Sequence, residues 1–203
     1  MSLVFCIGNG ESRKDLDLSI LPAHGEIYGT NALHRDWSDI LNCLICCDKR
    51  MVEEALASAT YTGPVYTRPK WEERIFENPR VQPLPDFTWK QKHKWQKHFH
   101  WGSGLHAAHL ACKNDAQVLV MIGHDFYGVS GNMHNNIYKG TDNYLDNNVT
   151  AVDPIFWIRQ FKILFNTFPD VKFIFLQPGD WQLPEIWTEE NFEVQDLNDN
   201  AWI

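Results

Sequence analysis

Short apolar runs alternate with segments of helical spacing along most of the chain. Five runs predict strands, at Leu3–Ile7, Glu26–Thr30, Asn42–Cys47, Gln117–Ile122 and Lys172–Leu176. The segments of helical spacing lie between them, at Ser12–Leu21, Asp36–Leu41, Lys49–Ala59, Gly104–Asn114 and Asp153–Phe168. Strands separated by helices predict a parallel sheet with right-handed crossovers and helices on both of its faces.

Three segments interrupt this alternation. Five prolines between Pro64 and Asp86 predict short strands and loops. Residues Gly128–Asn148 are polar and have no clear period, and a loop of this length in a compact domain is often a functional lid. The tail Asp180–Ile203 has no Lys or Arg and repeats Trp, which predicts an acidic strap packed by its aromatic side chains. We therefore expect residues 1–203 to form a single Rossmann-like α/β domain with a mainly parallel sheet, a lid and a C-terminal strap.

The composition indicates a globular chain and narrows its partners. Apolar residues make up 44% of the sequence, and the formal net charge of −8 argues against nucleic acid as a partner. Backbone N–H groups can still hold a small anionic ligand against that charge. No apolar run approaches the length of a membrane span, and no secretory leader pattern is visible. The five cysteines are an odd number, so we expect free thiols and a cytoplasmic protein.

Neither a metal site nor another cofactor is predicted. Cys43 and Cys46 have the spacing of a zinc-binding pair, but they lie in a strand-like run and no second pair follows. His106 and His109 share one face of a predicted helix without an obvious carboxylate partner. Such residues more often pack and form local hydrogen bonds.

The first strand ends in a turn with two glycines, Gly8-Asn9-Gly10-Glu11-Ser12. Glycine tolerates positive φ and leaves room for the close approach of a ligand. Ser12 is a suitable N-cap, and a helix that begins there offers unpaired N–H groups to a phosphate. The spacing is not GxGxxG, so an ordinary strand-to-helix turn is an equal interpretation on this motif alone.

Polar residues also follow the next two strands. Asn31 comes after Glu26–Thr30, and Asp48 comes after Asn42–Cys47. Because ligands bind outside the carboxyl ends of the strands in open α/β sheets, Asn9, Asn31 and Asp48 are expected around one crevice. Each of them has the alternative role of capping the following helix.

The second half of the chain repeats this arrangement. Ser103 and Gly104 introduce a helix, and Asp125 and Tyr127 follow the strand that ends at Ile122. We expect Asn9, Asn31, Ser103 and Asp125 to line one crevice at the carboxyl edge of the sheet. The loop that follows carries His134, Tyr138 and Tyr144, whose polar setting predicts a lid with tyrosine hydroxyls that donate to a phosphate.

These motifs together resemble the bacterial sialyltransferases of glycosyltransferase family 42. The resemblance rests on Gly8-Asn9-Gly10-Glu-Ser12, on Tyr28-Gly-Thr-Asn31, on Ser103-Gly104-Leu-His and on Ile122-Gly123-His124-Asp125-Phe126-Tyr127. It covers about residues 3 to 48 and 101 to 176. The glycine-rich opening also resembles, more distantly, the pterin pyrophosphokinase-like family.

The sialyltransferase resemblance implies roles for individual residues. Gly8, Asn9, Gly10, Asn31, Ser103 and Gly104 would hold the cytidine monophosphate part of a sugar nucleotide, and Tyr127 with Tyr138 or Tyr144 would contact the phosphate. Asp48 stands where the family usually has Asn. The family's base is a His just before the helix that follows the lid, but Val149–Asp153 contains none, so His134 is the nearest substitute.

Three functions are left open by the sequence. The leading one is a metal-independent transferase that uses a nucleotide-linked sugar as donor and an unidentified acceptor, with His134, Tyr138 and Tyr144 as catalytic residues. The second is a nucleotide or sugar-nucleotide binding protein without transferase activity. The third is a Mg²⁺-dependent diphosphate-transferring enzyme that uses Asp48 and Asp125. A homo-oligomer is compatible with each of them.

Overall fold

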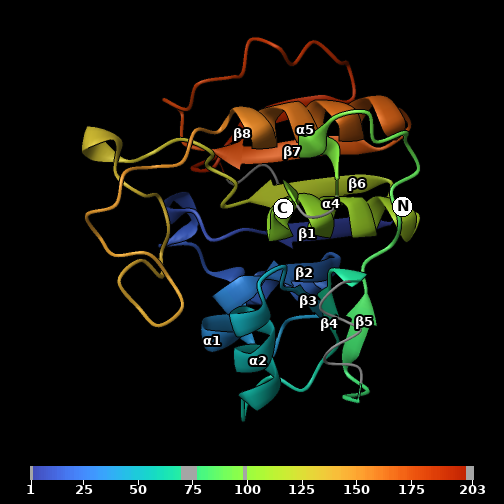
Figure 1. Ribbon diagram of the computed structural model, residues 1–203. Helices are drawn as coiled ribbons and strands as arrows, with labels where there is room; N and C mark the ends of the chain where they lie inside the picture. The colour runs from blue at the N-terminus through green and yellow to red at the C-terminus, as the bar shows by residue number, and fades with distance from the viewer. Residues whose placement is uncertain (1, 70–76, 98–99, 200–203) are drawn as a thin grey trace.

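The computed structural model describes residues 2–69, 77–97 and 100–199 (Figure 1). Within these residues eight strands form one sheet, in the order β5-β4-β3-β2-β1-β6-β7-β8. Their bounds are β1 (Leu3–Ile7), β2 (Glu26–Thr30), β3 (Cys43–Ile45), β4 (Val65–Thr67), β5 (Val81–Pro83), β6 (Val118–Ile122), β7 (Lys172–Gln177) and β8 (Phe192–Asp196). Every neighbouring pair is parallel, which confirms the predicted fold class.

The sheet is wider than the five predicted strands. β4 and β5 lie in the proline-rich segment for which only short strands and loops were expected. β8 lies in the acidic tail, where no strand was predicted, and pairs with β7. It is an edge strand in which most side chains remain accessible, so its mixed polar sequence lacks the apolar signal of a buried parallel strand.

The helices are α1 (His34–Trp37), α2 (Lys49–Ala57), α4 (Ser103–Lys113) and α5 (Ile155–Thr167). The predicted helix over Ser12–Leu21 is wrong, because the chain forms two short 3₁₀ helices there, η1 (Glu11–Arg13) and η2 (Leu18–Ala23). Asp17 separates them, since its side chain accepts a hydrogen bond from Ser19 N at 3.0 Å and caps the second one. This local bond competes with a continuous helix.

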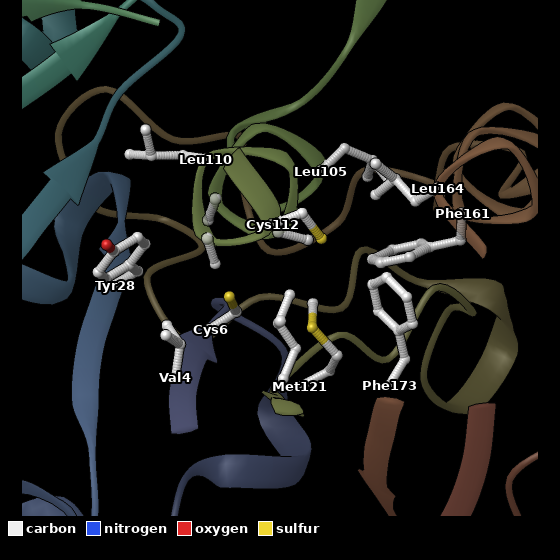
Figure 2. Close-up of a cluster of buried hydrophobic side chains, with 14 of the residues drawn as sticks. Val4, Cys6, Tyr28, Leu105, Leu110, Cys112, Met121, Phe161, Leu164 and Phe173 are labelled. Carbon is white, nitrogen blue, oxygen red and sulfur yellow. The ribbon is translucent and has the colours of Figure 1, made fainter. Parts of the chain in front are cut away.

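Two apolar layers enclose the sheet. Alternate residues of β1 face opposite sides, so that Val4 and Cys6 belong to one core cluster and Phe5 and Ile7 belong to the other. The first cluster lies beneath α4 and α5, as Figure 2 shows for Cys6, Met121 and Phe173 of the strands. The second lies beneath α2 and η2. The strands are therefore fixed from both faces, and only their ends are free to build a site.

The cysteines and the helix histidines belong to this core. All five cysteines are free and buried, and burial raises the pKa of the Cys6 and Cys46 thiols. His106 and His109 are fully buried on α4 with ring centroids 5.5 and 5.0 Å from that of Phe87. Among the described residues, no three His, Cys, Asp or Glu side chains are grouped as metal ligands.

The segment after β6 extends beyond the carboxyl ends of the strands and then returns to the sheet (Figure 1). Isolated antiparallel bridges join Val129 to Met133 and Met133 to Thr150. Ile137 N donates to Asn9 O at 2.9 Å, which fastens this segment to the turn after β1. No helix in the described part of the chain is both long and apolar enough to cross a membrane.

Candidate functional site

The order of the strands reverses at β1, and a cavity lies at the carboxyl edge of the sheet at this point. β2 to β5 extend the sheet on one side of β1, whereas β6 to β8 extend it on the other. Such a reversal leaves a crevice beyond the strand ends, where ligands commonly bind. A cavity of about 230 Å³ occupies it, which we call the inner cavity.

Most of the residues predicted for the site line the inner cavity. They are Gly8, Asn9, Gly10, Asn31, Ser103, Gly104, Asp125, Tyr127 and His134. The expectation that Asn9, Asn31, Ser103 and Asp125 lie around one crevice agrees with this geometry. Ser12 lines a neighbouring outer cavity, whereas Asp48, Tyr138 and Tyr144 line neither of the two.

The glycine-rich turn after β1 packs tightly against the turn after β6. Gly8 N donates to Ile122 O at 2.7 Å, and Gly10 N donates to Gly123 O at 2.9 Å. A Cβ atom on Gly10 would lie 2.3 Å from Cγ of Asp125. Gly10 has a φ of −62°, so the turn needs glycine for close packing and not for positive φ. At Gly10 the carboxylate of Asp125 therefore occupies the space that was predicted for a ligand.

Asp125 accepts the hydrogen bonds of donor groups at the start of η1. Its carboxylate accepts hydrogen bonds from Ser12 N at 3.0 Å and from Ser12 Oγ, and Glu11 N donates to Asn135 Oδ1 at 2.8 Å. Ser12 lies inside η1, whose N-cap is Gly10, so the prediction that Ser12 is an N-cap is wrong. The N–H groups of Gly10, Glu11 and Ser12 are already bonded and leave no donor for a phosphate.

The start of α4 is the second helix terminus at the inner cavity. Gly102 is its N-cap, and no side chain caps the first turn. Gly102, Ser103, Gly104 and Leu105 all line the cavity. The first N–H groups of a helix have no partner within it, and an eleven-residue helix carries a partial positive charge at this end. This terminus suits an anionic group better than η1 does.

Ser103 orients the Asn31 side chain. Cys47 N donates to Ser103 Oγ at 3.0 Å, and the Ser103 hydroxyl donates to Asn31 Oδ1 at 2.8 Å. This arrangement makes Nδ2 the remaining group of the Asn31 amide, beside the α4 terminus. The backbone of Asn31 has a φ of 50°, a left-handed conformation that Asn tolerates better than most residues.

Tyr144 positions Asn9 and does not line the cavity. Its hydroxyl accepts hydrogen bonds from Asn9 Nδ2 at 3.0 Å and from Ala32 N at 3.3 Å, and burial raises its pKa. Asn9 Oδ1 is buried without a partner among the described residues. Rotating the amide by 180° would let Tyr144 donate to Oδ1 and leave Nδ2 unbonded. In either orientation one polar atom of Asn9 has no partner among the described residues.

Tyr138 was expected in a polar lid, but the structure places it in the core. Its ring is 5% exposed and belongs to the core beneath α2 and η2. The hydroxyl donates to Asp36 Oδ2 at 2.6 Å and accepts a hydrogen bond from Arg13 Nη2 at 3.1 Å. Burial, as the main cause, raises its pKa to about 12. A hydroxyl with both of these partners joins the loop to the core and is not directed at either cavity.

Asp48 also differs from its prediction. It is exposed at the start of α2, where its carbonyl oxygen accepts hydrogen bonds from Met51 N and Val52 N. β3 ends at Ile45, and Cys46 and Cys47 separate it from Asp48, which lines neither cavity. The pair of Asp48 and Asp125 that a Mg²⁺ site would need does not line one cavity.

Two histidines line the inner cavity. His134 comes from the segment after β6, and its pKa is lowered by burial and by Lys139, against the opposing effect of Glu11. His124 follows β6, and its Nε2 lies 3.2 Å from Cys6 O. Burial lowers the pKa of His124 to about 4, so the ring is neutral at pH 7. A neutral ring bonded to a carbonyl oxygen through Nε2–H keeps Nδ1 as an acceptor.

Tyr127 is the predicted tyrosine that does reach the cavities. It lines both of them, and burial raises its pKa. The preceding Phe126 has a φ of 63°, which is rare for a bulky residue and is held by packing against Phe161 and Trp187 at 5.4 and 5.7 Å between ring centroids. This turn brings both Asp125 and Tyr127 to the cavities.

The outer cavity adjoins the inner one and has a volume of about 750 Å³. Asp125, Tyr127, Asn135, Ala151 and Val152 line both cavities, so the two are parts of one site. The outer cavity is also bounded by the loop after β7, which contributes Asp180, Trp181 and Gln182. Among the described residues no Lys or Arg lines either cavity.

Several residues of this site were not predicted from the sequence. His124 belongs to the motif that carries the family resemblance, but it was not assigned to the site, although it lies just beyond the predicted strand end at Ile122. Trp157, on the first turn of α5, lines the inner cavity next to Gly102, with Nε1 3.6 Å from where a Cβ on that glycine would lie. Gln177 and Trp181 follow or end β7 and line the outer cavity. Nothing in the local pattern separates these three from core or strap residues.

Comparisons with known proteins agree with the fold and not with a family assignment. No family model matches the chain, and no curated protein matches its sequence. A variant of the sialyltransferase CST-II in complex with CMP aligns over 88% of this chain and 83% of its own, with a TM-score of 0.62 and 15% identity. CstII from Campylobacter jejuni with cytidine-5'-monophosphate aligns over 88% and 81%, with a TM-score of 0.58 and 16% identity. At such identities the likeness is one of fold: this chain is an α/β protein whose fold is similar to that of the sialyltransferase CstII.

Proposed function

We propose that the inner cavity binds the nucleotide of a cytidine-linked sugar donor and that the chain is a glycosyltransferase-like protein. The observation that carries the proposal is the uncapped start of α4 beside the Asn31 amide, at the reversal point of the sheet. Backbone N–H groups and an amide Nδ2 are neutral donors, which suit a phosphodiester in a site without Lys or Arg. The solved structures with CMP supply the cytidine as the first base to test.

Trp157 and Asn9 support the binding of a nucleoside in the same cavity. The Trp157 ring offers an aromatic surface on which a base can stack. Asn9 and His124 Nδ1 offer polar atoms that can form hydrogen bonds with hydroxyl or amino groups of the nucleoside. A preformed cavity with a few convergent polar groups is typical of a small-molecule site.

Transfer of the sugar would follow from His134 and Tyr127. His134 accepts the proton of an acceptor hydroxyl while the hydroxyl oxygen attacks the anomeric carbon. The bond between that carbon and the phosphate oxygen breaks, and the electron pair leaves with the phosphate of cytidine monophosphate. Tyr127 donates a hydrogen bond to this leaving oxygen and needs no metal to do so. Both side chains line the cavity.

A second candidate function is a nucleotide-binding protein without transfer activity. The observation that favours it is the internal use of the loop tyrosines, because Tyr138 bonds to Asp36 and Arg13 and Tyr144 bonds to Asn9 and Ala32. Of the three candidate tyrosines, from which Tyr127 and one other were expected to contact the phosphate, only Tyr127 is then left to assist a leaving group.

Nucleotide binding is tested by thermal unfolding with cytidine, uridine, guanosine and adenosine monophosphates, each with and without Mg²⁺. We expect CMP to raise the melting temperature without Mg²⁺, because a ligand at a hundred times its Kd stabilises by about 2.7 kcal/mol. Asn31→Asp should abolish this rise, since it places a carboxylate beside the phosphate. Asn42→Asp is the matched control, because the exposed Asn42 uses only its Oδ1, as an acceptor for Ile27 N. Equal CMP responses in the two variants would overturn the proposal.

A further inference from the structure

The outer cavity differs in chemistry from the inner one. It is larger, and it shares lining residues with the inner cavity, so a sugar attached to a nucleotide in the inner cavity can extend into it. Tyr127 and Asn135 lie at the junction of the two. The inner cavity alone is smaller than most ligand sites, which span about 300 to 1,000 Å³. The outer cavity therefore has the room that a sugar needs.

Trp181 forms a fixed aromatic wall of the outer cavity. Its Nε1 donates to Asp125 O at 2.8 Å, and its ring centroid lies 6.0 Å from those of Phe126 and Tyr127. These contacts hold the ring in one position while the side chain remains half-buried and lines the cavity. A rigid aromatic face loses little conformational freedom when a ligand packs on it. The C–H face of a sugar ring is an apolar surface that matches it.

Gln177 carries an unused acceptor at the same cavity. The side chain is completely buried and lines the cavity, and its Nε2 donates to His124 O at 2.8 Å. Its Oε1 has no partner within the described chain. Because a buried acceptor without a donor is unfavourable, a hydroxyl or amino group of a ligand is the natural partner for it.

The charges around the outer cavity all have one sign. Glu11, Asp125, Asp153 and Asp180 line it. Glu11 is paired with Lys139, and Asp125 is bonded to Ser12. Asp153 and Asp180 form no ion pair with any described residue. Asp125, whose partners at Ser12 are neutral, also keeps its charge. An anionic ligand would therefore meet carboxylates that no ion pair with a described residue compensates, whereas hydroxyl and ammonium groups would be attracted to them.

We infer that the outer cavity binds a sugar that bears hydroxyl or amino groups and no anionic group. The inference rests on the proposed function for the position of the nucleotide, and it argues against a sugar acid such as sialic acid in this cavity. The sugar belongs either to the donor or to the acceptor, because both meet at the reacting carbon. Trp181 packs against its ring, Gln177 Oε1 accepts a hydrogen bond from one of its hydroxyl or amino groups, and Asp153 and Asp180 disfavour an anionic group.

The test measures binding of methyl glycosides by saturation-transfer NMR, with four probes: galactoside, glucosaminide, glucuronide and N-acetylneuraminide. We expect the galactoside and the glucosaminide to bind at least tenfold more tightly than the two sugar acids. Asp180→Lys should reduce this preference, because it replaces one of the free carboxylates with a cation on an exposed position while Asp153 keeps its charge. Asp146→Lys makes the same change on an exposed residue outside both cavities and should leave the preference as it is.

The outcomes separate this inference from the proposed function. Binding of neutral sugars without any binding of CMP would support the inference and contradict the proposed nucleotide site. Binding of CMP with no sugar bound, or with the sugar acids bound as tightly as the galactoside, would overturn the inference alone. An uncleavable cytidine nucleotide with a neutral sugar then distinguishes the source, since it displaces the galactoside if the donor sugar occupies the cavity and leaves it bound if the acceptor does.

Discussion

At the scale of single residues, burial decides which polar side chains of this site can react. His124 is 7% exposed, and its depressed pKa of about 4 follows from desolvation, against the opposing bond to Cys6 O. Its neutral ring is kept in one orientation by that bond and by the neighbouring turn, where a Cβ on Gly104 would lie 2.5 Å from Cε1. His124 is therefore a neutral hydrogen-bond acceptor, and His134 is the more accessible of the two histidines at the inner cavity.

The buried His124 predicts a loss of stability in weak acid. In the unfolded chain its pKa is about 6.5, so below this pH the unfolded state binds a proton that the folded state rejects until about pH 4. The free energy of unfolding should fall by about 2 kcal/mol between pH 7 and pH 5 from this group alone. The measurement is urea unfolding of the protein and of His124→Gln at both pH values, where the variant should lose less. NMR titration of the imidazole checks the cause directly, and a His124 pKa near 6.5 would contradict it.

The positions of polar residues were predictable at this scale, and their partners were not. Asn9, Asn31 and Asp125 follow strand ends, and the sequence placed them correctly at one crevice. Tyr138 shows the limit, because a polar loop gives no sign that one of its rings is buried against Arg13 and Asp36. Those partners are more than 100 positions away in the sequence, so the bonds exist only once the sheet has brought the segments together.

At the scale of elements, the two turns that end β1 and β6 act as one unit. Gly8 and Gly10 bond to the turn after β6, and the Asp125 carboxylate occupies the space above Gly10. The sequence identified both turns but assigned the free N–H groups to the wrong one. The sequence pattern of a strand followed by glycine and serine cannot distinguish the two cases, because its N–H groups can donate either to a ligand or to a carboxylate from another turn.

The tight contact at Gly10 predicts a large cost for the smallest substitution. Gly10→Ala would place Cβ 2.3 Å from Cγ of Asp125, so the carboxylate must move and lose its bonds to Ser12. We expect a destabilisation of about 3 kcal/mol, the sum of overpacking and lost charged hydrogen bonds. Gly102→Ala is the matched change at the other turn and should cost less than about 1 kcal/mol, because its nearest contact would be 3.6 Å. Chemical denaturation measures both, and equal midpoints would refute the steric argument.

At the scale of the whole molecule, the alternation of strands and helices sufficed for a parallel sheet but not for its order. The reversal at β1, which creates the crevice, depends on β6 returning to the opposite side of β1 from β2. The edge strands β5 and β8 were difficult to recognise in the sequence, because β5 contains proline and β8 contains many polar residues. An edge strand needs fewer apolar positions than a central strand. The resulting molecule joins an inner cavity with a single carboxylate to an outer one with several, and Asp125 and Tyr127 line both.

The proposed transfer reaction assigns different roles to His134 and Tyr127. If His134 is the base and Tyr127 assists the leaving phosphate, Tyr127→Phe should lower kcat for cytidine-nucleotide sugar turnover about a hundredfold, and His134→Ala by at least as much. Tyr138→Phe should reduce stability and leave kcat within a few fold, because its hydroxyl serves Asp36 and Arg13. The pKa of His134 is lowered by burial and by Lys139, so His134 becomes protonated at a lower pH than an ordinary histidine does, and kcat should fall at a correspondingly lower pH. Initial rates from pH 5 to 8 with neutral and acidic sugar donors measure this. Equal rates in the protein and in His134→Ala would remove His134 as the base, and no turnover with any donor would favour the binding protein that lacks transfer activity.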